Sequence, residues 1–240
     1  MSVNYLLKSA TIVNEGKKVV ADLLIQEGRI TKISSSISTE INCVEINLEG
    51  KYLLPGCIDD QVHFREPGLI HKATIATESR AAVAGGITSF MEMPNTVPNA
   101  LTQELLEDKY QIASQTSYAN YSFMMGGTND NLEEVLKTNP RNVAGIKLFL
   151  GSSTGNMLVD NQEVLEKIFS STKMLIAVHC EDEATIKANL EKYKEEYGED
   201  IPVKYHHLIR SAEACYLSSS KAIEDRKSTR LNSSHDQRSR

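Results

Sequence analysis

The sequence lacks the long apolar runs of a membrane protein, because none approaches the ~20 residues that cross a bilayer. Met1–Val13 also lacks the charged start and apolar centre of a secretory signal. Positive charge is scarce: 26 Lys and Arg stand against 32 Asp and Glu, which gives a net charge of −6. This balance argues against nucleic acid or an anionic membrane as the main partner.

Paired cysteines and nucleotide-binding loops are absent as well. The four cysteines are scattered and form no Cys-x-x-Cys pair, which predicts reduced, buried thiols in a cytoplasmic protein. No glycine-rich dinucleotide loop follows a predicted strand, and the loop 151–156 lacks the Gly-Lys-Ser/Thr ending of a P-loop. We interpret that loop as lining the mouth of a site.

The sequence does contain an alternation of strand and helix patterns. Residues 1–54 are predicted to form short strands, with a hairpin-type turn at Glu27-Gly28. Further along, strands are predicted at Ile58–Phe64, Ile87–Met93, Tyr121–Met125, Ala144–Leu150 and Leu175–His179. Helices are predicted between and after them, at Ala73–Ala84, Gln103–Gln115, Leu132–Lys137, Glu163–Phe169 and Glu183–Tyr197. Repeated βα units predict an α/β fold with a parallel sheet, either doubly wound or closed as a (β/α)8 barrel.

The chain is short for a closed barrel. Five barrel strands are predicted, where closure needs eight and typically ~250 residues. The composition changes at Arg226: the segment 226–240 has one large apolar residue, Leu231, and is predicted to be disordered. It resembles translated synthetic adapter sequence, and the alternative is a natural basic tail. We therefore expect a partial barrel over residues 55–225, a non-native or disordered tail over 226–240, and a reading frame that continues.

The stretch Pro55–Gly68 carries the first candidate site. It is predicted to form a strand between two Pro-Gly turns. Side chains alternate along a strand, so Asp59, Gln61 and His63 share one face. Arg65 follows just past the strand end, where loop residues often meet ligands.

Three further residues lie in or beyond predicted strands. Lys147 is the one charge in a buried run, which indicates either a partner or modified form, or a side chain that extends to the strand end. His179 ends a strand at the edge where barrels place their sites, although a lone histidine there is usually structural. Asn95 follows a proline at a strand end and is either a turn residue or an amide donor beside Arg65. The remaining histidines are predicted to lie at the surface or behind the site: His71, His206, His207 and His235.

These motifs resemble the amidohydrolase superfamily, whose first barrel strand carries Asp-x-His-x-His. The sequence Arg65-Glu66-Pro67-Gly68 narrows the resemblance to the dihydroorotases, since allantoinases usually carry Asn where Arg65 stands. Gln61 stands where the first histidine of the pair is expected, which puts one zinc ligand in question. The resemblance implies a partial TIM-type barrel beside a small N-terminal β-sandwich segment over residues 1–54.

The resemblance also implies residue roles. One or two zinc ions would be held by His63, His179 and Lys147, the lysine carboxylated and bridging, with Gln61 in the place of the missing histidine. Arg65 and Asn95 would bind the substrate carboxylate. A sixth-strand histidine and the catalytic eighth-strand aspartate are expected beyond this chain.

The activity that the resemblance implies is that of a zinc-dependent dihydroorotase of pyrimidine biosynthesis, interconverting N-carbamoyl-aspartate and dihydroorotate. Metal-activated hydroxide would attack the ring amide carbonyl, and zinc would polarise it. The chain as written is expected to be incomplete for catalysis. The partner would be a small-molecule substrate, and a homodimer is compatible with the resemblance. Two alternatives stay open: an inactive homologue that serves as a structural partner of another pyrimidine enzyme, favoured by Gln61, and a related hydantoinase or allantoinase, disfavoured by Arg65.

Overall fold

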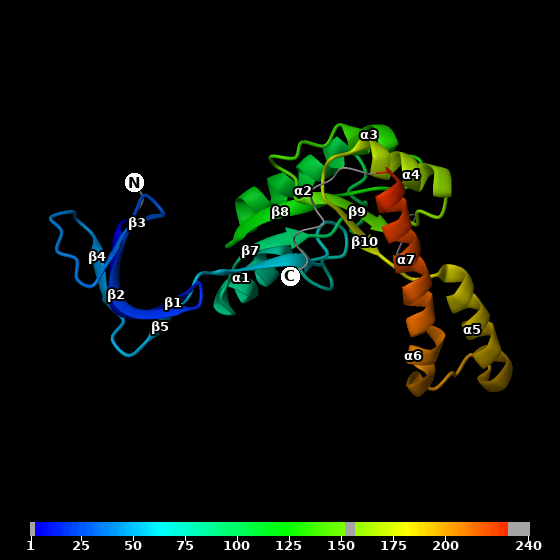
Figure 1. The fold of residues 1–240 in the computed structure, drawn as a ribbon, viewed down its shortest axis with the longest axis horizontal. Helices are drawn as coiled ribbons and strands as arrows, with labels where there is room; N and C mark the ends of the chain where they lie inside the picture. The colour runs from blue at the N-terminus through cyan, green and yellow to red at the C-terminus, as the bar shows by residue number, and fades with distance from the viewer. Residues whose placement is uncertain (1–2, 152–156, 230–240) are drawn as a thin grey trace. The chain divides into compact units, whose positions relative to one another are not determined.

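The computed structural model describes residues 3–151 and 157–229, with side chains to Lys227, and divides the chain into two compact units, Met1–Cys57 and Ile58–Arg240. The division falls close to the expected boundary at residue 54. Figure 1 shows the elements of each unit. No helix of the described ranges combines the length and apolar character that a bilayer crossing requires.

The first unit is a mixed five-stranded sheet. Its strands are β1 (Tyr5–Asn14), β2 (Lys17–Gln26), β3 (Arg29–Ser34), β4 (Val44–Asn47) and β5 (Tyr52–Leu53). The order is β3-β2-β1-β4, and β5 also pairs with β1. The predicted turn at Glu27-Gly28 is confirmed, and both residues have positive φ, as a tight hairpin turn needs. A small core is formed by Leu6, Leu24 and Ile37.

The second unit alternates strands and helices and contains every candidate site residue. Its sheet consists of β6 (Cys57–Val62), β7 (Ile87–Glu92), β8 (Asn120–Gly126), β9 (Gly145–Phe149) and β10 (Ile176–His179), in the order β10-β9-β8-β7-β6. Strands β7 to β10 pair in parallel. The helices are α1 (Ile75–Ala84), α2 (Gln103–Thr116), α3 (Leu132–Leu136), α4 (Gln162–Ser171), α5 (Glu183–Tyr197), α6 (His206–Ile209) and α7 (Ala212–Thr229), with a 3-10 turn at Val203–Tyr205. The unit is therefore an α/β structure with a parallel sheet, as predicted.

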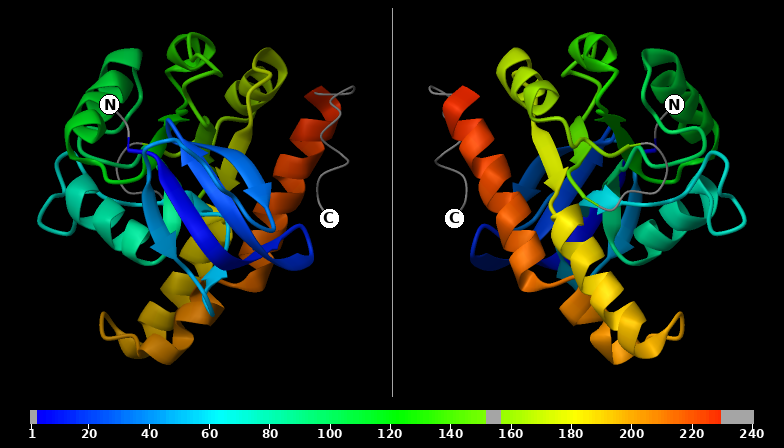
Figure 2. Two further views of the ribbon diagram at one scale, coloured as in Figure 1. Left: turned by 90° about the vertical axis from the view of Figure 1, so that its left-hand side faces the viewer. Right: turned by 90° about the vertical axis from the view of Figure 1, so that its right-hand side faces the viewer.

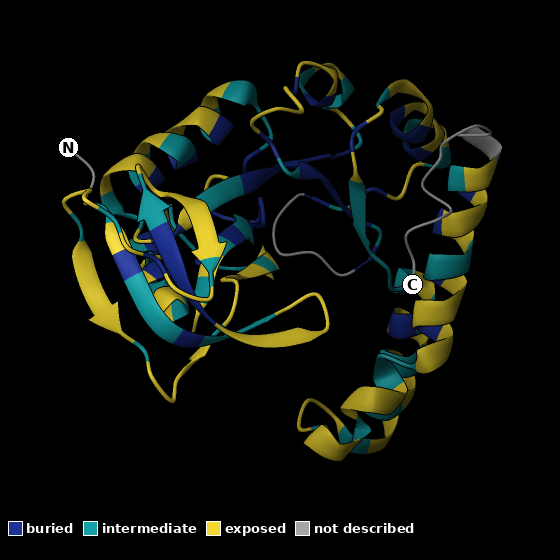
Figure 3. Cartoon of the chain, turned by 60° about the vertical axis from the view of Figure 1, so that its left-hand side comes forward, coloured by how far each residue is buried: buried dark blue, intermediate teal, exposed yellow. Residues whose placement is uncertain are grey.

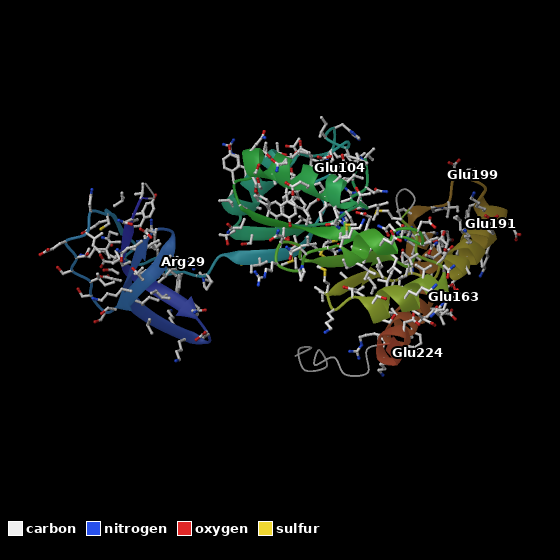
Figure 4. All side chains as sticks on the ribbon, turned by 90° about the horizontal axis from the view of Figure 1, so that it is seen from above. Arg29, Glu104, Glu163, Glu191, Glu199 and Glu224 are labelled. Atoms are coloured by element: carbon white, nitrogen blue, oxygen red, sulfur yellow. The ribbon has the colours of Figure 1, made fainter. Side chains whose placement is uncertain are left out.

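The helices of this unit lie in an arc outside the strands, as in part of a barrel (Figure 2). Strand β9 is buried along its whole length, and Ile146 and Leu148 belong to the main core. Figure 3 shows the same contrast between buried strands and exposed outer helix faces. The labelled glutamates in Figure 4, among them Glu104, Glu163 and Glu224, lie on such exposed faces, in keeping with the net negative charge.

Local chemistry sets the ends of the helices. Thr74 caps α1 by accepting a hydrogen bond from the Thr77 amide at 3.1 Å, so the helix begins at Ile75 rather than at the expected Ala73. Asp182 caps α5 in the same way through the Thr185 amide at 2.8 Å. Helix α5 ends before Gly198, which has a φ of 66°, and its predicted bounds are confirmed.

Two boundaries differ from expectation. Strand β6 ends at Val62, so His63 and Phe64 lie in the loop beyond it. Helix α7 continues across the composition change at Arg226 to Thr229. A helix that has already formed can extend by one backbone hydrogen bond per residue, without an apolar pattern of its own. The rest of the predicted tail lies outside the described residues.

Candidate functional site

The candidate residues lie toward the carboxyl ends of the parallel strands. His63 and Arg65 follow β6, Asn95 follows β7, Lys147 lies within β9, and His179 is the last residue of β10. Carboxyl ends of parallel strands share one edge of the sheet, which is where α/β barrels bind their ligands. Strands β7 and β8 lie between the strand that precedes His63 and the strand that contains Lys147. The charge of Lys147 nevertheless contributes to lowering the pKa of His63. The sheet therefore brings the two side chains within electrostatic reach.

His63 is fixed by Asn95. Its Nδ1 lies 2.8 Å from Asn95 Oδ1, and because an amide oxygen can only accept, Nδ1 carries the proton and donates. Burial lowers the pKa of His63 below its usual value, with smaller contributions from the charges of Arg65 and Lys147, while the hydrogen bond to Asn95 opposes the shift. The imidazole is thus held neutral, with the lone pair on Nε2. This is the form that binds a metal.

Lys147 is buried, and no carboxylate pairs with it among the residues that the structure describes. Its side chain is 2% exposed, and its Nζ lies 5.4 Å from the centre of the Phe149 ring. Within residues 3–151 and 157–229, no hydrogen bond or ion pair reaches this ammonium group. Burial lowers the pKa of Lys147, which favours the uncharged amine. A neutral amine is the form that can react with carbon dioxide to give a carbamate.

His179 belongs to a short chain of polar contacts. Its Nε2 donates to Glu181 Oε2 at 3.1 Å, and Arg210 donates to the same oxygen. Burial raises the pKa of Glu181, but the hydrogen bonds from Arg210 and His179 outweigh it, so this pKa lies below its usual value. The carboxylate therefore stays ionised and fixes the ring, leaving Nδ1 as the second nitrogen. Carboxylates commonly orient metal-binding histidines in this way.

Arg65 and Asn95 line one cavity of about 300 Å³. Lys72 lines it as well, so two cationic side chains face the same space. Asn95 is 8% exposed, and it joins this cavity to His63 through the 2.8 Å hydrogen bond. A planar anion bound between a guanidinium and an amide would therefore lie next to an imidazole.

The loops that follow β6 and β7 interlock around this cavity. The Val97 amide donates to Pro67 O at 3.2 Å. Gly68 has a φ of 81°, and a Cβ placed on it would lie 1.9 Å from Val97 O. Glu66 ties the first loop to α1, because its Oε2 accepts from the Ile75 amide at 2.7 Å. Loop shape here depends on a glycine that no other residue could replace without a shift.

Gln61 differs from the other expected ligands. It lies within β6, its side chain is exposed, and its backbone N–H donates to Asp59 Oδ1 at 3.1 Å. Three of the histidines that are not predicted to be ligands, His71, His206 and His207, are exposed. His235 and the loop residues 152–156 lie outside the described ranges.

Sequence reasoning missed four charged residues near the site: Glu92, Lys109, Glu181 and Arg210. Glu92 and Lys109 form an ion pair in which both side chains are 1% exposed. Glu92 is the lone charge in the predicted strand Ile87–Met93, the same signal that singled out Lys147. The contact between Glu181 and Arg210 could not be predicted from the sequence, because it forms only in the folded chain.

The donors fit a divalent metal in part. In the described part of the chain, no three His, Cys, Asp or Glu side chains form a cluster that could hold an ion. Two oriented imidazoles and a buried amine without an acceptor are present instead. Carboxylation of Lys147 would give that amine two oxygen donors and remove the unpaired charge. His63, His179 and carboxylated Lys147 are therefore the residues that could hold a divalent metal.

Comparisons with known proteins converge on one group. The family model described as dihydro-orotase-like matches residues 50–199. The chain is 34% identical over 202 residues to a dihydroorotase of Methanosarcina acetivorans, covering 82% of this chain and 42% of that protein. It is 33% identical over 232 residues to a dihydroorotase of Bacillus cytotoxicus, covering 89% and 53%. The chain thus spans about half the length of these curated relatives.

Solved structures agree on the fold. The L-hydantoinase (dihydropyrimidinase) of Arthrobacter aurescens matches with a TM-score of 0.88 and 25% identity, over 95% of this chain and 51% of that one. The dihydropyrimidinase of Brevibacillus agri matches with a TM-score of 0.79 and 24% identity, over 93% and 49%.

Proposed function

The chain belongs to the dihydro-orotase-like family, and from that premise we propose that it carries the substrate-carboxylate site of a zinc-dependent dihydroorotase. The reaction would interconvert N-carbamoyl-aspartate and dihydroorotate in pyrimidine biosynthesis, in the cytoplasm. One observation carries the proposal: Arg65 and Asn95 line the same cavity, and Asn95 is hydrogen-bonded to His63. Dihydroorotate bears a carboxylate on the ring whose amide is hydrolysed, so it needs a carboxylate clamp beside the reacting bond.

Each residue has a role in this proposal. The Arg65 guanidinium binds the carboxylate with two parallel hydrogen bonds, and Lys72 adds positive charge to the same cavity. Asn95 holds His63 as the tautomer whose Nε2 is unprotonated. The Glu181–Arg210 pair holds the His179 ring. Zinc, when bound, would supply Lewis-acid polarisation of the amide carbonyl and lower the pKa of a water molecule.

A hydantoinase-like activity is the second candidate, because the hydantoinase of Arthrobacter aurescens is a close structural match. The two differ in what the substrate presents to Arg65. Dihydroorotate has a carboxylate, whereas dihydrouracil is the same ring without one. With dihydrouracil bound, the cations Arg65 and Lys72 that line the cavity would have no carboxylate to pair with.

The test compares these two substrates. The complete gene product containing these residues is purified with zinc, its metal content is measured, and hydrolysis of dihydroorotate and of dihydrouracil is followed. We expect kcat/KM to favour dihydroorotate by about 100-fold or more, as for a lost charge-assisted contact. A preference for dihydrouracil would identify a hydantoinase. Full metal content with neither activity would identify an inactive homologue.

A further inference from the structure

The backbone of Arg65 is held in an unfavourable conformation. Its φ is 70°, in the left-handed region that non-glycine residues rarely adopt. Such a conformation is strained and persists only where the surroundings impose it. Arg65 also lines the cavity, so its backbone conformation determines the direction in which its guanidinium group points.

The surroundings that impose it are centred on Glu92. Burial raises the pKa of Glu92, and Lys109 together with the backbone amides of Arg65 and Phe64 opposes that rise, so both amides lie beside the Glu92 carboxylate. Glu92 is the last residue of β7, and the Phe64 ring packs on Phe90 of the same strand with centroids 4.6 Å apart. The carboxylate therefore offers an acceptor next to two consecutive amides, immediately before the Arg65 side chain.

Lys109 of α2 completes the arrangement. Its Nζ contacts the Glu92 carboxylate and donates to Met93 O at 2.9 Å. Both charged side chains are 1% exposed. Burying such a pair is a poor way to gain stability, since well-packed apolar residues often do as well or better. The pair does give Phe64 and Arg65 an acceptor that an apolar pair could not provide.

We propose that Glu92 and Lys109 are a positioning pair that holds the Phe64–Arg65 backbone so that the Arg65 guanidinium faces the substrate carboxylate. The inference rests on the carboxylate-binding role of Arg65 proposed above. The pair touches no reacting atom, so it should affect substrate affinity more than the chemical step.

The test uses the complete, zinc-loaded gene product. Glu92→Leu combined with Lys109→Met removes both charges and the acceptor, while Glu92→Gln combined with Lys109→Met keeps an oxygen acceptor. We expect the first variant to raise KM for dihydroorotate about tenfold, ~1.4 kcal/mol, with kcat changed less than about threefold and zinc content unchanged. The second variant should recover most of the loss. An equal loss in both would overturn the proposal.

The same substitutions in an Arg65→Ala background separate this inference from the proposed function. If the pair acts through Arg65, combining Glu92→Leu with Lys109→Met should raise KM little in the Arg65→Ala protein. An undiminished effect there would make the pair merely structural. If Arg65→Ala alone leaves KM unchanged, the carboxylate-binding role fails, and this inference fails with it.

A second variant guards against misfolding of the first. Glu92→Asp keeps the charge beside Lys109 but draws the carboxylate back from the two amides, and it should also raise KM while leaving kcat and Tm near their original values. KM could stay unchanged both in Glu92→Asp and in a folded protein carrying Glu92→Leu and Lys109→Met. That result would overturn the positioning role of the pair and leave the carboxylate-binding role of Arg65 intact.

Discussion

Lys147 combines burial with a charge that has no acceptor among the described side chains. In water-free surroundings an unpaired ammonium costs several kcal/mol, so the amine must lose its proton, gain a partner or be modified. A carbamate is chemically suited to this position, because it replaces the cation with an anion. That anion and the two imidazoles could then bind the same metal.

Replacing Lys147 should therefore affect stability and metal binding in opposite directions. In metal-free, CO2-free buffer, Lys147→Met should raise the free energy of unfolding by about 1–3 kcal/mol, since an apolar side chain replaces a buried amine. Bound zinc should be lost. Because burial lowers the folded pKa, the stability gain should be full below that pKa and shrink as pH rises toward the ordinary value of 10.5.

Denaturant unfolding and metal analysis check this pair of effects. The exposed Lys167 of α4 offers a matched control, and Lys167→Met should change stability by less than about 0.5 kcal/mol. Loss of stability in Lys147→Met without metal would show that the amine has a stabilising partner.

Arg65 should not tolerate lysine. Arg65→Lys keeps the charge but loses the bidentate fork, so we expect a loss of about 2 kcal/mol or more in kcat/KM for dihydroorotate. Steady-state kinetics of the complete gene product measure it, with Arg80→Lys on the exposed face of α1 as the control. An unchanged kcat/KM would assign Arg65 a structural role.

Gln61 should limit the metal content. An amide oxygen is a weaker zinc donor than an imidazole nitrogen, and the Gln61 side chain is exposed. The complete gene product should therefore retain nearer one tightly bound zinc than two, and Gln61→His should raise the content toward two. Metal analysis after identical dialysis decides it, and equal values near two in both proteins would contradict the expectation.

At the scale of elements, the two loops that line the cavity depend on each other. Gly68 combines positive φ with backbone contact, whereas Gly86 has a φ of 91° but nothing within 4 Å of an added Cβ. Comparing substitutions at these two glycines therefore distinguishes the cost of a positive φ from the cost of a steric clash.

Gly68→Ala should therefore be more harmful than Gly86→Ala. Both substitutions cost roughly 1–2 kcal/mol for the left-handed backbone, and Gly68→Ala must also push the Val97 loop away. We expect Gly68→Ala to lower stability further and to raise KM for dihydroorotate, while Gly86→Ala leaves KM unchanged. Thermal melts and kinetics distinguish them, and matched effects in both variants would disprove the interlocking of the loops.

The elements with the strongest local signals could be predicted from the sequence. Helix α5 has a capping aspartate before it and a glycine after it, and its bounds are confirmed. Lys147 could be identified because one charge interrupts an apolar strand. The Glu92–Lys109 pair could not be predicted, because a lysine on a helix pattern looks exposed until the partner strand is known. The left-handed backbone of Arg65 was equally hidden, since arginine rarely adopts it.

At the scale of the molecule, β10 determines how the isolated chain should behave. Among the strands described, β10 pairs with β9 on one side only. An open strand edge presents unpaired amides and carbonyls to other chains.

The isolated 240-residue chain should therefore self-associate. Light scattering after size exclusion should give masses above the 26.6 kDa of a monomer, rising with concentration. The complete gene product serves as the comparison. A 240-residue monomer with a sharp cooperative melt would contradict this prediction.

The strand order β10-β9-β8-β7-β6 also follows the order in which the ribosome makes the chain. At roughly 5–20 residues per second, each strand emerges only after its neighbour has been synthesised. Every new βα unit can dock at once on an edge that is already in place, without waiting for a distant segment. Adding strands in this order closes only a short loop of chain at each step. A nascent chain that stalls between two units would expose an open strand edge like that of β10.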